Sequence, residues 1–171
     1  MWFTGLPASG KSTLARALRD ELLKAKPTEV LDGDEVREYL SKGLGYTRED
    51  RDTNVRRIGF VARALARNGA IAIGAAISPY AAARDEVREL SKRDGVGFVE
   101  VHLDCPLETL VKRDPKGLYQ KALAGQLKHF TGVDDPYQPP ETPELRLDTS
   151  RLSVEACVVR LREVLAARGL P

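Results

Sequence analysis

The chain has 171 residues, 42% of them apolar, and its 27 Lys and Arg residues nearly balance 25 Asp and Glu residues, for a formal net charge of +2. This length and composition predict a single domain, residues 1–171, that buries its own core. The balanced charge gives no reason to expect a general nucleic-acid surface, and no apolar run is long enough to span a membrane. Cys105 and Cys157 lack metal-ligand spacing, so we expect reduced thiols in a cytoplasmic protein.

Strand and helix patterns alternate through the first half of the chain. In chain order they are a strand at 1–3, a helix at 11–25, a strand at 29–31, helices at 35–40 and 49–68, and a strand at 70–77. The first helix is expected to stop before Pro27, and Asp34 is placed to cap the helix that follows it. Residues 70–77 are almost continuously apolar, which indicates a strand buried on both faces of a parallel sheet.

The same alternation continues in the second half. In chain order the elements are a helix at 78–93, a strand at 97–103, helices at 106–112 and 118–124, a strand at 145–147 and a helix at 153–168. Ser78 is expected to be the N-cap of its helix, with Pro79 at the first helical position. Residues 125–144 are rich in glycine, proline and aromatic residues, and so long a loop is usually functional. The order predicts a three-layer α/β/α fold with a mostly parallel five-stranded sheet and a lid at about 113–144.

One segment carries a strong chemical signal: Gly5-Leu-Pro-Ala-Ser-Gly10-Lys11-Ser12, between the first strand and the first helix. A strand that turns into a helix leaves backbone N–H groups free to bind anionic oxygens, and the two glycines allow a close approach. Lys11 reaches the β- and γ-phosphates of a nucleotide, and the Ser12 hydroxyl completes a Mg²⁺ shell. A chance match is the alternative, which the flanking strand and helix disfavour. The segment predicts a nucleoside triphosphate site.

Residues that follow the strands are further candidates, because ligands in parallel α/β sheets bind at the carboxyl ends of the strands. Asp32 and Asp34 place two carboxylates beside the glycine loop. A kinase that acts on a hydroxyl needs a carboxylate to accept the proton or to hold Mg²⁺-bound water, and Asp34 fits that role. The alternative is that Asp34 only caps a helix.

Cationic and aromatic residues in the predicted loops complete the candidate set. An anionic second substrate needs several cations, because guanidinium groups bind phosphate-like oxygens in pairs. Aromatic side chains in loops either stack on a base or anchor the lid, and the sequence leaves both interpretations open. The cations are Arg37, Arg51, Arg56, Arg113, Lys116 and Lys128, and the aromatic residues are Tyr46, Phe130 and Tyr137.

Six ordered blocks resemble the adenylyl-sulfate kinase (APS kinase) family of P-loop kinases. The blocks are FTGLPASGKST at 3–13, LDGDEVR at 31–37, EDR and NVRR within 49–57, ISPY at 77–80, RDPKGLY at 113–119 and KHFTG at 128–132. The resemblance implies a P-loop kinase fold and transfer of the γ-phosphate of ATP to the 3′-hydroxyl of adenosine 5′-phosphosulfate (APS). The products would be PAPS, the activated sulfate donor, and ADP. Mg²⁺, a homodimer, and a fusion or association with ATP sulfurylase are implied as well.

The resemblance also implies roles for individual residues. Lys11 and Asp34 would be catalytic, and Ser12 and Asp34 would hold Mg²⁺, directly or through water. Ser78 matches a serine often described as a phosphorylated intermediate, but we expect direct transfer because no general base is evident beside it. The ATP site would be Gly5, Leu6, Pro7, Ala8, Ser9, Gly10, Lys11, Ser12, Thr13 and Arg113. The APS site would be Asp34, Arg37, Tyr46, Arg51, Asn54, Ile77, Ser78, Lys116, Leu118, Lys128 and Phe130, with Tyr46 and Phe130 on either side of the adenine.

Other functions are weighed against this one. A regulatory module that only binds nucleotide would be expected to lose the loop lysine or the Mg²⁺ serine, and Lys11 and Ser12 are both present. A small P-loop kinase for another alcohol would not need the blocks at 31–37 and 128–132. A GTPase is disfavoured because the sequence contains no Asn-Lys-x-Asp segment.

Overall fold

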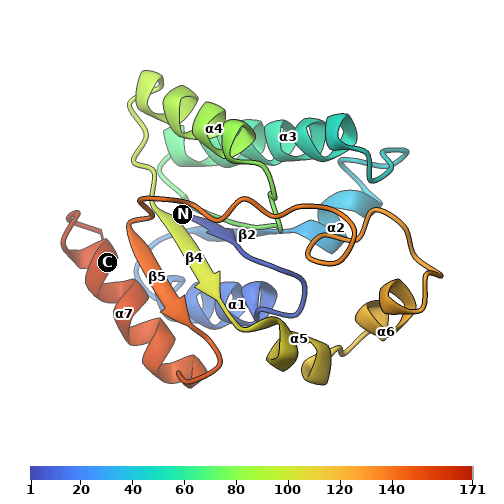
Figure 1. Cartoon of the computed structure of the whole chain (residues 1–171). Helices are drawn as coiled ribbons and strands as arrows, with labels where there is room; N and C mark the ends of the chain where they lie inside the picture. The colour runs from blue at the N-terminus through green and yellow to red at the C-terminus, as the bar shows by residue number, and fades with distance from the viewer. Residues whose placement is uncertain (171) are drawn as a thin grey trace.

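Five parallel strands form one sheet in the order β2-β3-β1-β4-β5 (Figure 1). The structure is a computed structural model that describes residues 1–170, so Pro171, the last residue of the predicted domain, lies outside the described residues. The strands are β1 (Trp2–Thr4), β2 (Thr28–Asp32), β3 (Ile71–Ala75), β4 (Glu100–Asp104) and β5 (Leu145–Asp148). β1 lies at the centre, with Phe3 opposite Ala75 on one side and Val101 on the other.

Helices cover both faces of the sheet. Figure 1 shows α1 and α7 on one face, α3 and α4 on the other, and α5 and α6 beyond the carboxyl end of β4. The helices are α1 (Lys11–Leu22), α2 (Gly33–Glu38), α3 (Arg48–Arg67), α4 (Ala81–Arg93), α5 (Leu107–Arg113), α6 (Leu118–Leu123) and α7 (Val154–Ala166). The predicted three-layer α/β fold is confirmed. No helix within residues 1–170 has both the length and the apolar character that crossing a membrane requires.

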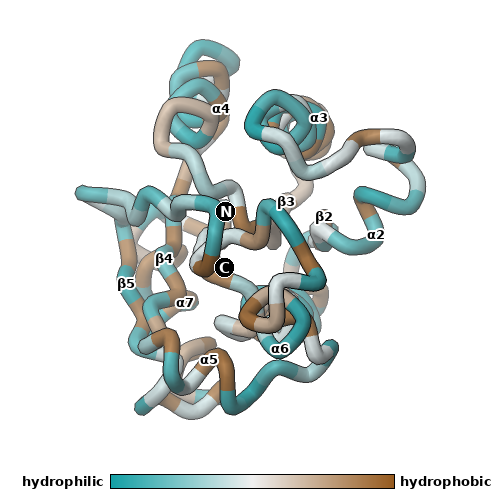
Figure 2. Tube along the Cα trace, turned by 45° about the vertical axis from the view of Figure 1, so that its right-hand side comes forward, coloured by the Kyte–Doolittle hydropathy of each residue, from teal (hydrophilic) through white to brown (hydrophobic). Residues whose placement is uncertain are grey.

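Successive residues of β1 belong to different halves of the core, because neighbouring side chains on a strand point to opposite faces. Phe3 packs with Leu18 of α1 and Leu161 of α7. Trp2 packs with Ile58 of α3 on the other face. Burying each such side chain stabilises the fold by about 1.5–3 kcal/mol. In Figure 2 the outer sides of α3 and α4 are largely teal, as expected for helices that bury one face only.

A smaller cluster joins the lid to the glycine loop. Tyr119 of α6 meets Phe130 edge to face, with ring centroids 4.9 Å apart and planes at 82°. Leu110 of α5 is buried in the same cluster, and Leu6 of the glycine loop packs against it. The Tyr119 hydroxyl also donates a hydrogen bond to the carbonyl of Pro7 at 3.1 Å. These contacts place the lid directly over the glycine loop.

The helix predicted from Ser78 starts later, so the N-cap prediction for Ser78 is wrong. Ser78 has φ 43°, in the left-handed region, whereas an N-cap is extended. Tyr80 is the extended N-cap of α4, and β3 already ends at Ala75. The backbone N–H of Ala81 donates at 2.8 Å to the side-chain oxygen of Gln138. The acceptor for the first turn of α4 therefore comes from a residue distant in sequence, which local patterns cannot reveal.

Two further predictions need correction near the first two helices. The helix predicted at 11–25 ends at Leu22, and the backbone turns at Ala25, whose N–H donates to the Leu22 carbonyl at 3.0 Å. Asp34 does not cap α2: Asp32 is the N-cap, and its carboxylate accepts from the backbone N–H of Asp34 at 3.1 Å. The side chain of Asp34 is thereby left free for other contacts.

Candidate active site

The glycine loop, residues 5–10, joins β1 to α1. Gly10 is the N-cap of α1 and has φ 94°, a left-handed conformation that favours glycine. A Cβ at Gly5 would lie 2.6 Å from the carbonyl oxygen of Leu103, so glycine is needed where the loop leaves the sheet. No side chain caps α1. Its first N–H groups are therefore available to bind phosphate oxygens.

Lys11, the first residue of α1, bends back over the loop and is only 9% exposed. Its Nζ donates hydrogen bonds to the carbonyls of Gly5 and Leu6, each at 2.8 Å. Burial lowers the pKa of Lys11 to about 7, while the nearby carboxylates of Asp32 and Asp34 act in the opposite direction. An anionic phosphate in the loop would favour the charged form of this lysine.

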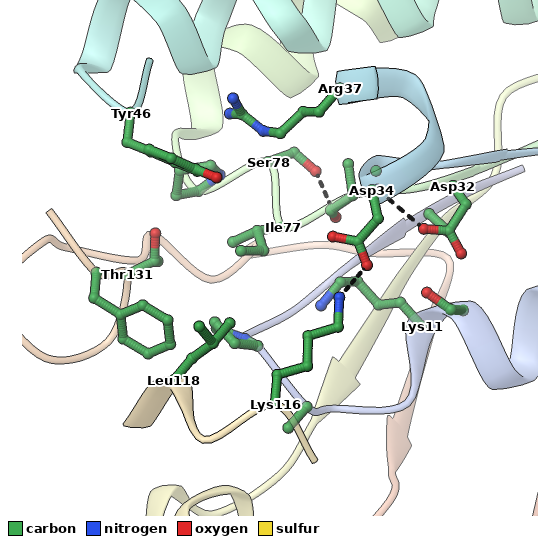
Figure 3. A pocket seen from close by; sticks show the side chains of 18 of the residues that line it. Lys11, Asp32, Asp34, Arg37, Tyr46, Ile77, Ser78, Lys116, Leu118 and Thr131 are labelled. Atoms are coloured by element: carbon green, nitrogen blue, oxygen red, sulfur yellow. Dashed lines mark hydrogen bonds and ion pairs between the residues drawn. The ribbon is translucent and has the colours of Figure 1, made fainter. Parts of the chain in front are cut away.

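A cavity of about 530 Å³ lies beside the loop, at the carboxyl ends of β2 and β3. In Figure 3, Arg37 and Tyr46 lie on one side of it, Lys116 and Leu118 on the other, and Ile77 between them. This volume suits a small-molecule site. Most residues predicted for the site line this cavity: Pro7, Ala8, Gly10, Lys11, Ser12, Thr13, Asp34, Arg37, Tyr46, Arg51, Asn54, Ile77, Ser78, Lys116, Leu118, Lys128 and Phe130.

Four predicted ATP-site residues lie outside the cavity lining. Gly5, Leu6 and Ser9 belong to the glycine loop but contribute no surface to the cavity. Arg113, at the end of α5, donates from Nη2 to the carbonyl of Thr149 at 2.5 Å. The structure thus brings together Arg113, a predicted ATP-site residue, and Thr149, which directly follows β5.

Two other candidates from the sequence lie away from the cavity. Arg56 is half exposed on α3 and pairs with Glu86 of α4 at 2.8 Å. Tyr137 stacks on His102, with ring centroids 5.9 Å apart, and its hydroxyl hydrogen-bonds to the Thr4 hydroxyl at 3.0 Å. Burial raises the pKa of Tyr137 to about 12. Tyr137 therefore anchors the lid, the second of the two roles that the sequence left open.

One side of the cavity combines cations with an aromatic ring. The guanidinium carbon of Arg37 lies 4.4 Å from the ring centroid of Tyr46, and that of Arg51 lies 5.5 Å from it. Arg51 is buried and donates to the carbonyls of Tyr46 at 3.0 Å and His129 at 2.5 Å. Asn54 is also buried, and its Oδ1 has no hydrogen-bond partner within the described residues. A hydroxyl or amino group of a ligand would satisfy that oxygen.

The carboxylates meet the lid at the other side. Nζ of Lys116 forms an ion pair with the carboxylate of Asp34 (Figure 3). Asp32 is buried and pairs with Arg16 at 3.3 Å. Within residues 1–170 no group of three or more His, Cys, Asp or Glu side chains could hold a metal by itself. Ser12 and Asp34 still fit Mg²⁺, because this ion usually takes one or two protein oxygens together with phosphates and water.

Ser78 lines the cavity but its hydroxyl is engaged elsewhere. The residue is 2% exposed. The indole N–H of Trp2 donates to Oγ of Ser78 at 3.0 Å, and Oγ donates to the carbonyl of Ala76 at 3.1 Å. Both hydrogen-bonding functions of the hydroxyl are thus used, and neither partner can remove its proton.

Several cavity residues were not singled out from the sequence. Tyr119 and Val55 lie on apolar helix faces, where the periodic pattern predicts burial but not a cavity. His129 and Thr131 flank Phe130, and His129 has φ 58°. The sequence signals for His129 and Thr131 are their position next to Phe130 and their place in the block at 128–132. All of these residues line the cavity: Arg16, Val55, Tyr119, His129 and Thr131.

The central parallel strand, the glycine loop and the buried Lys11 define a P-loop nucleotide-binding protein, and Asp34 lines the same cavity.

Comparisons with known proteins identify the kinase family. A family model described as Adenylylsulphate kinase matches residues 1–148. An adenylyl-sulfate kinase of Myxococcus xanthus is 57% identical over 170 residues, covering 99% of this chain and 92% of the relative. A probable bifunctional SAT/APS kinase 2 of Sorangium cellulosum is 54% identical over 99% of this chain and 29% of its own length. The structure of the Mycobacterium tuberculosis APS kinase CysC in complex with AMPPNP and APS has a TM-score of 0.93 at 43% identity, covering 96% of this chain and 95% of that one. The chain belongs to the adenylyl-sulfate kinase family.

Proposed function

We propose that the protein is an adenylyl-sulfate kinase that transfers the γ-phosphate of ATP to the 3′-hydroxyl of APS and releases PAPS and ADP. The observation that carries the proposal is the shared cavity. Lys11 and the glycine loop line one part of it, Arg37 and Tyr46 line another, and Asp34 projects between them (Figure 3). Family membership supplies the identity of the two substrates.

ATP binds with its phosphates at the glycine loop. The unpaired N–H groups at the start of α1 donate to the phosphate oxygens, and Lys11 exchanges its carbonyl partners for the β- and γ-phosphates. Arg113 and Thr149 border the adenine of ATP.

APS binds on the opposite side, where cations and an aromatic ring meet. Tyr46 and Phe130 enclose its adenine, while Arg37 and Arg51 neutralise the phosphosulfate. Asn54 offers its unpartnered Oδ1 to a hydroxyl of the ribose. Further contributions come from Ile77, Ser78, Lys116, Leu118 and Lys128.

Asp34 receives the proton of the 3′-hydroxyl as the 3′-oxygen bonds to the γ-phosphorus. The bond between that phosphorus and the oxygen that bridges it to the β-phosphate breaks, and ADP leaves with the bridging oxygen. Lys11 and the N–H groups of the loop stabilise the charge that spreads over the transferred phosphoryl group. Mg²⁺, held by Ser12 and Asp34 directly or through water, would neutralise the β- and γ-phosphate oxygens.

Product analysis tests the proposal. Incubation with Mg²⁺, ATP and APS should yield PAPS and ADP in equal amounts, as resolved by ion-exchange chromatography. A module that only regulates would bind PAPS without turnover. A kinase for another alcohol would leave APS unchanged and phosphorylate a sugar or a shikimate-like acceptor, and either result would overturn the proposal.

The remaining predictions belong to the same proposal. Residues 1–171 act as one domain, and the two buried, unpaired cysteines suit the reducing conditions of the cytoplasm. A homodimer is proposed from the family resemblance, and sedimentation equilibrium tests it. Association with an ATP sulfurylase is proposed because that enzyme class supplies APS, and the relative from Sorangium cellulosum is described as bifunctional.

A further inference from the structure

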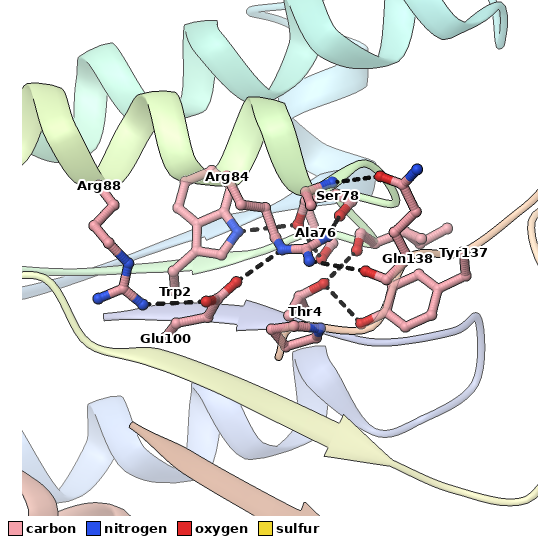
Figure 4. Close-up of polar contacts among 12 residues, drawn as sticks. Trp2, Thr4, Ala76, Ser78, Arg84, Arg88, Glu100, Tyr137 and Gln138 are labelled. Atoms are coloured by element: carbon pink, nitrogen blue, oxygen red, sulfur yellow. Dashed lines mark hydrogen bonds and ion pairs between the residues drawn. The ribbon is translucent and has the colours of Figure 1, made fainter. Parts of the chain in front are cut away.

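A network of polar contacts, buried at Arg84 and Glu100 and more exposed at Gln138, joins β4 to the segment after β3 and to the lid (Figure 4). Its centre is Arg84 of α4, which is 2% exposed and does not line the cavity. Each guanidinium nitrogen of Arg84 has one acceptor. Nε donates to Oε1 of Glu100 at 2.7 Å, Nη1 to the carbonyl of Ser78 at 2.7 Å, and Nη2 to the carbonyl of Gln138 at 2.8 Å. One side chain thus joins β4, the segment after β3 and the lid.

The contact with Ser78 holds a strained part of the cavity lining. Ser78 is not glycine, yet it has φ 43°, and such conformations persist only where their surroundings enforce them. Arg84 donates a hydrogen bond to the Ser78 carbonyl, and Trp2 donates one to the Ser78 hydroxyl. The preceding carbonyl, of Ile77, accepts from the Thr4 hydroxyl at 2.7 Å. Ile77 and Ser78 both line the cavity, so these bonds fix the shape of the surface that APS meets.

The contact with Gln138 fastens the lid to the same segment. The backbone N–H of Gln138 donates to the carbonyl of Pro79 at 2.8 Å, and its side-chain oxygen accepts from the N–H of Ala81 at 2.8 Å. With the bond from Arg84, Gln138 makes three hydrogen bonds to residues 79–84. One cluster of hydrogen bonds therefore fixes the lid relative to residues 77–80, and Arg84 contacts both.

The charge of Arg84 is balanced within the network. Glu100 pairs with it through Oε1 and with Arg88 through Oε2, at 3.1 Å. Glu144 pairs with Arg88 at 2.5 Å. Because the carboxylates neutralise the two arginines, the bonds from Arg84 to the carbonyls of Ser78 and Gln138 are not needed for charge balance. Arg84 therefore has two distinct roles: its charge neutralises Glu100, and its hydrogen bonds to the two carbonyls position the cavity lining.

We propose that Arg84 is a positioning residue for the acceptor site: it sets the 77–78 segment against the lid and so controls APS binding without contacting either substrate. The proposal rests on the proposed function. It predicts an effect on APS rather than on ATP, because Arg84 has no hydrogen bond to the glycine loop.

The test compares two variants. Arg84→Gln alone would leave Glu100 buried without its main partner, so the variant is Arg84→Gln/Glu100→Gln, in which two amides replace the ion pair. The matched control is Glu100→Gln, which retains both carbonyl contacts of Arg84 but leaves its charge without a carboxylate, so thermal unfolding of both variants is measured alongside the kinetics. We expect the double variant to raise the KM for APS about tenfold or more, with the KM for ATP within about twofold of wild type. Glu100→Gln should leave the KM for APS within about threefold.

A second readout does not depend on the reaction. Hydrogen exchange of the ligand-free protein should be faster at residues 130–138 in the double variant than in Glu100→Gln, with unchanged exchange in β1 and β4 as the sign of an intact fold. A wild-type protein that forms no PAPS would refute the proposed function but leave this comparison valid. Equal KM values for APS in the two variants, an equal rise for APS and ATP, or unchanged exchange in the lid would each overturn the role of Arg84.

Discussion

Lys116 of the lid and Asp34 at the start of α2 form an ion pair between segments 82 residues apart in the sequence. Both side chains are largely exposed, 57% for Lys116 and 74% for Asp34. Exposed pairs of this kind contribute about 0–1 kcal/mol to stability. The pair therefore opens at little cost when substrates enter, and the Asp34 carboxylate remains accessible to an acceptor hydroxyl.

Asp34→Asn should lower kcat by about 10²–10⁴-fold, because the amide cannot accept the proton of the 3′-hydroxyl. Affinity for ADP in the absence of Mg²⁺ should change little, since the glycine loop is unaltered. Steady-state kinetics and titration with ADP measure the two effects. Asp20→Asn, an exposed carboxylate on α1, is the matched control and should keep wild-type turnover. Full activity of Asp34→Asn would show that another group accepts the proton.

Lys11 should make nucleotide binding depend on pH. Its pKa in the free protein is lowered by burial to about 7, and bound phosphates should raise it. At pH 8 the free protein then holds this lysine mostly neutral and the complex holds it charged, so binding takes up a proton. Affinity for ATP should fall by up to about tenfold per pH unit above 7, until the pKa of the complex is reached.

Calorimetric titration at pH 8, in buffers with different ionisation enthalpies, measures this proton uptake. Lys11→Ala is the control, and it should abolish the uptake and reduce phosphoryl transfer by about 10²–10³-fold. Uptake that persists in Lys11→Ala would assign the proton to a different group.

Phe130→Ala should raise the KM for APS and also weaken the lid. The ring lines the cavity and packs against Tyr119, so its removal takes away a stacking surface and opens a void. Truncation of a buried phenylalanine costs about 3–5 kcal/mol in stability. Thermal unfolding and kinetics should therefore both change. Phe60→Ala, at an exposed position on α3 outside the cavity, should leave the KM unaffected, and an effect of Phe130→Ala on ATP alone would contradict the placement of APS.

Ser78→Ala should keep turnover within about fivefold of wild type, because direct transfer requires no serine nucleophile. The substitution removes the acceptor for the Trp2 indole N–H, which should lower the free energy of unfolding by about 1–3 kcal/mol. Turnover with labelled ATP, followed by mass spectrometry of the protein, checks this. Inactivity of Ser78→Ala together with a phosphorylated Ser78 in the wild type would establish a covalent intermediate.

Local patterns predicted the order of strands and helices and the position of the glycine loop. Both depend on side-chain periodicity and on glycine at Gly5 and Gly10, which are properties of neighbouring residues. The same patterns misplaced the start of α4, because its first turn is satisfied by Gln138 from the lid. They also assigned the cap of α2 to Asp34 instead of Asp32, a difference of two residues that only backbone geometry resolves.

For the cavity, residues next to strand ends could be predicted because parallel strands end at one edge of the sheet. Contacts between residues distant in the sequence could not be predicted. Arg56 resembled the other cations in sequence, but it pairs with Glu86 on the outer surface. Tyr137, like Phe130, is an aromatic residue in the predicted lid, yet it stacks on His102 instead of lining the cavity. The first outcome depends on how α3 packs against α4 and the second on how the lid folds back, and local sequence encodes neither.

The most direct test of the central claim is a crystal structure with AMPPNP and APS bound together. The account predicts the β- and γ-phosphates within hydrogen-bonding distance of Nζ of Lys11, and the 3′-hydroxyl of APS within hydrogen-bonding distance of the Asp34 carboxylate. A nucleotide bound away from the glycine loop, or an Asp34 carboxylate turned away from both ligands, would contradict it.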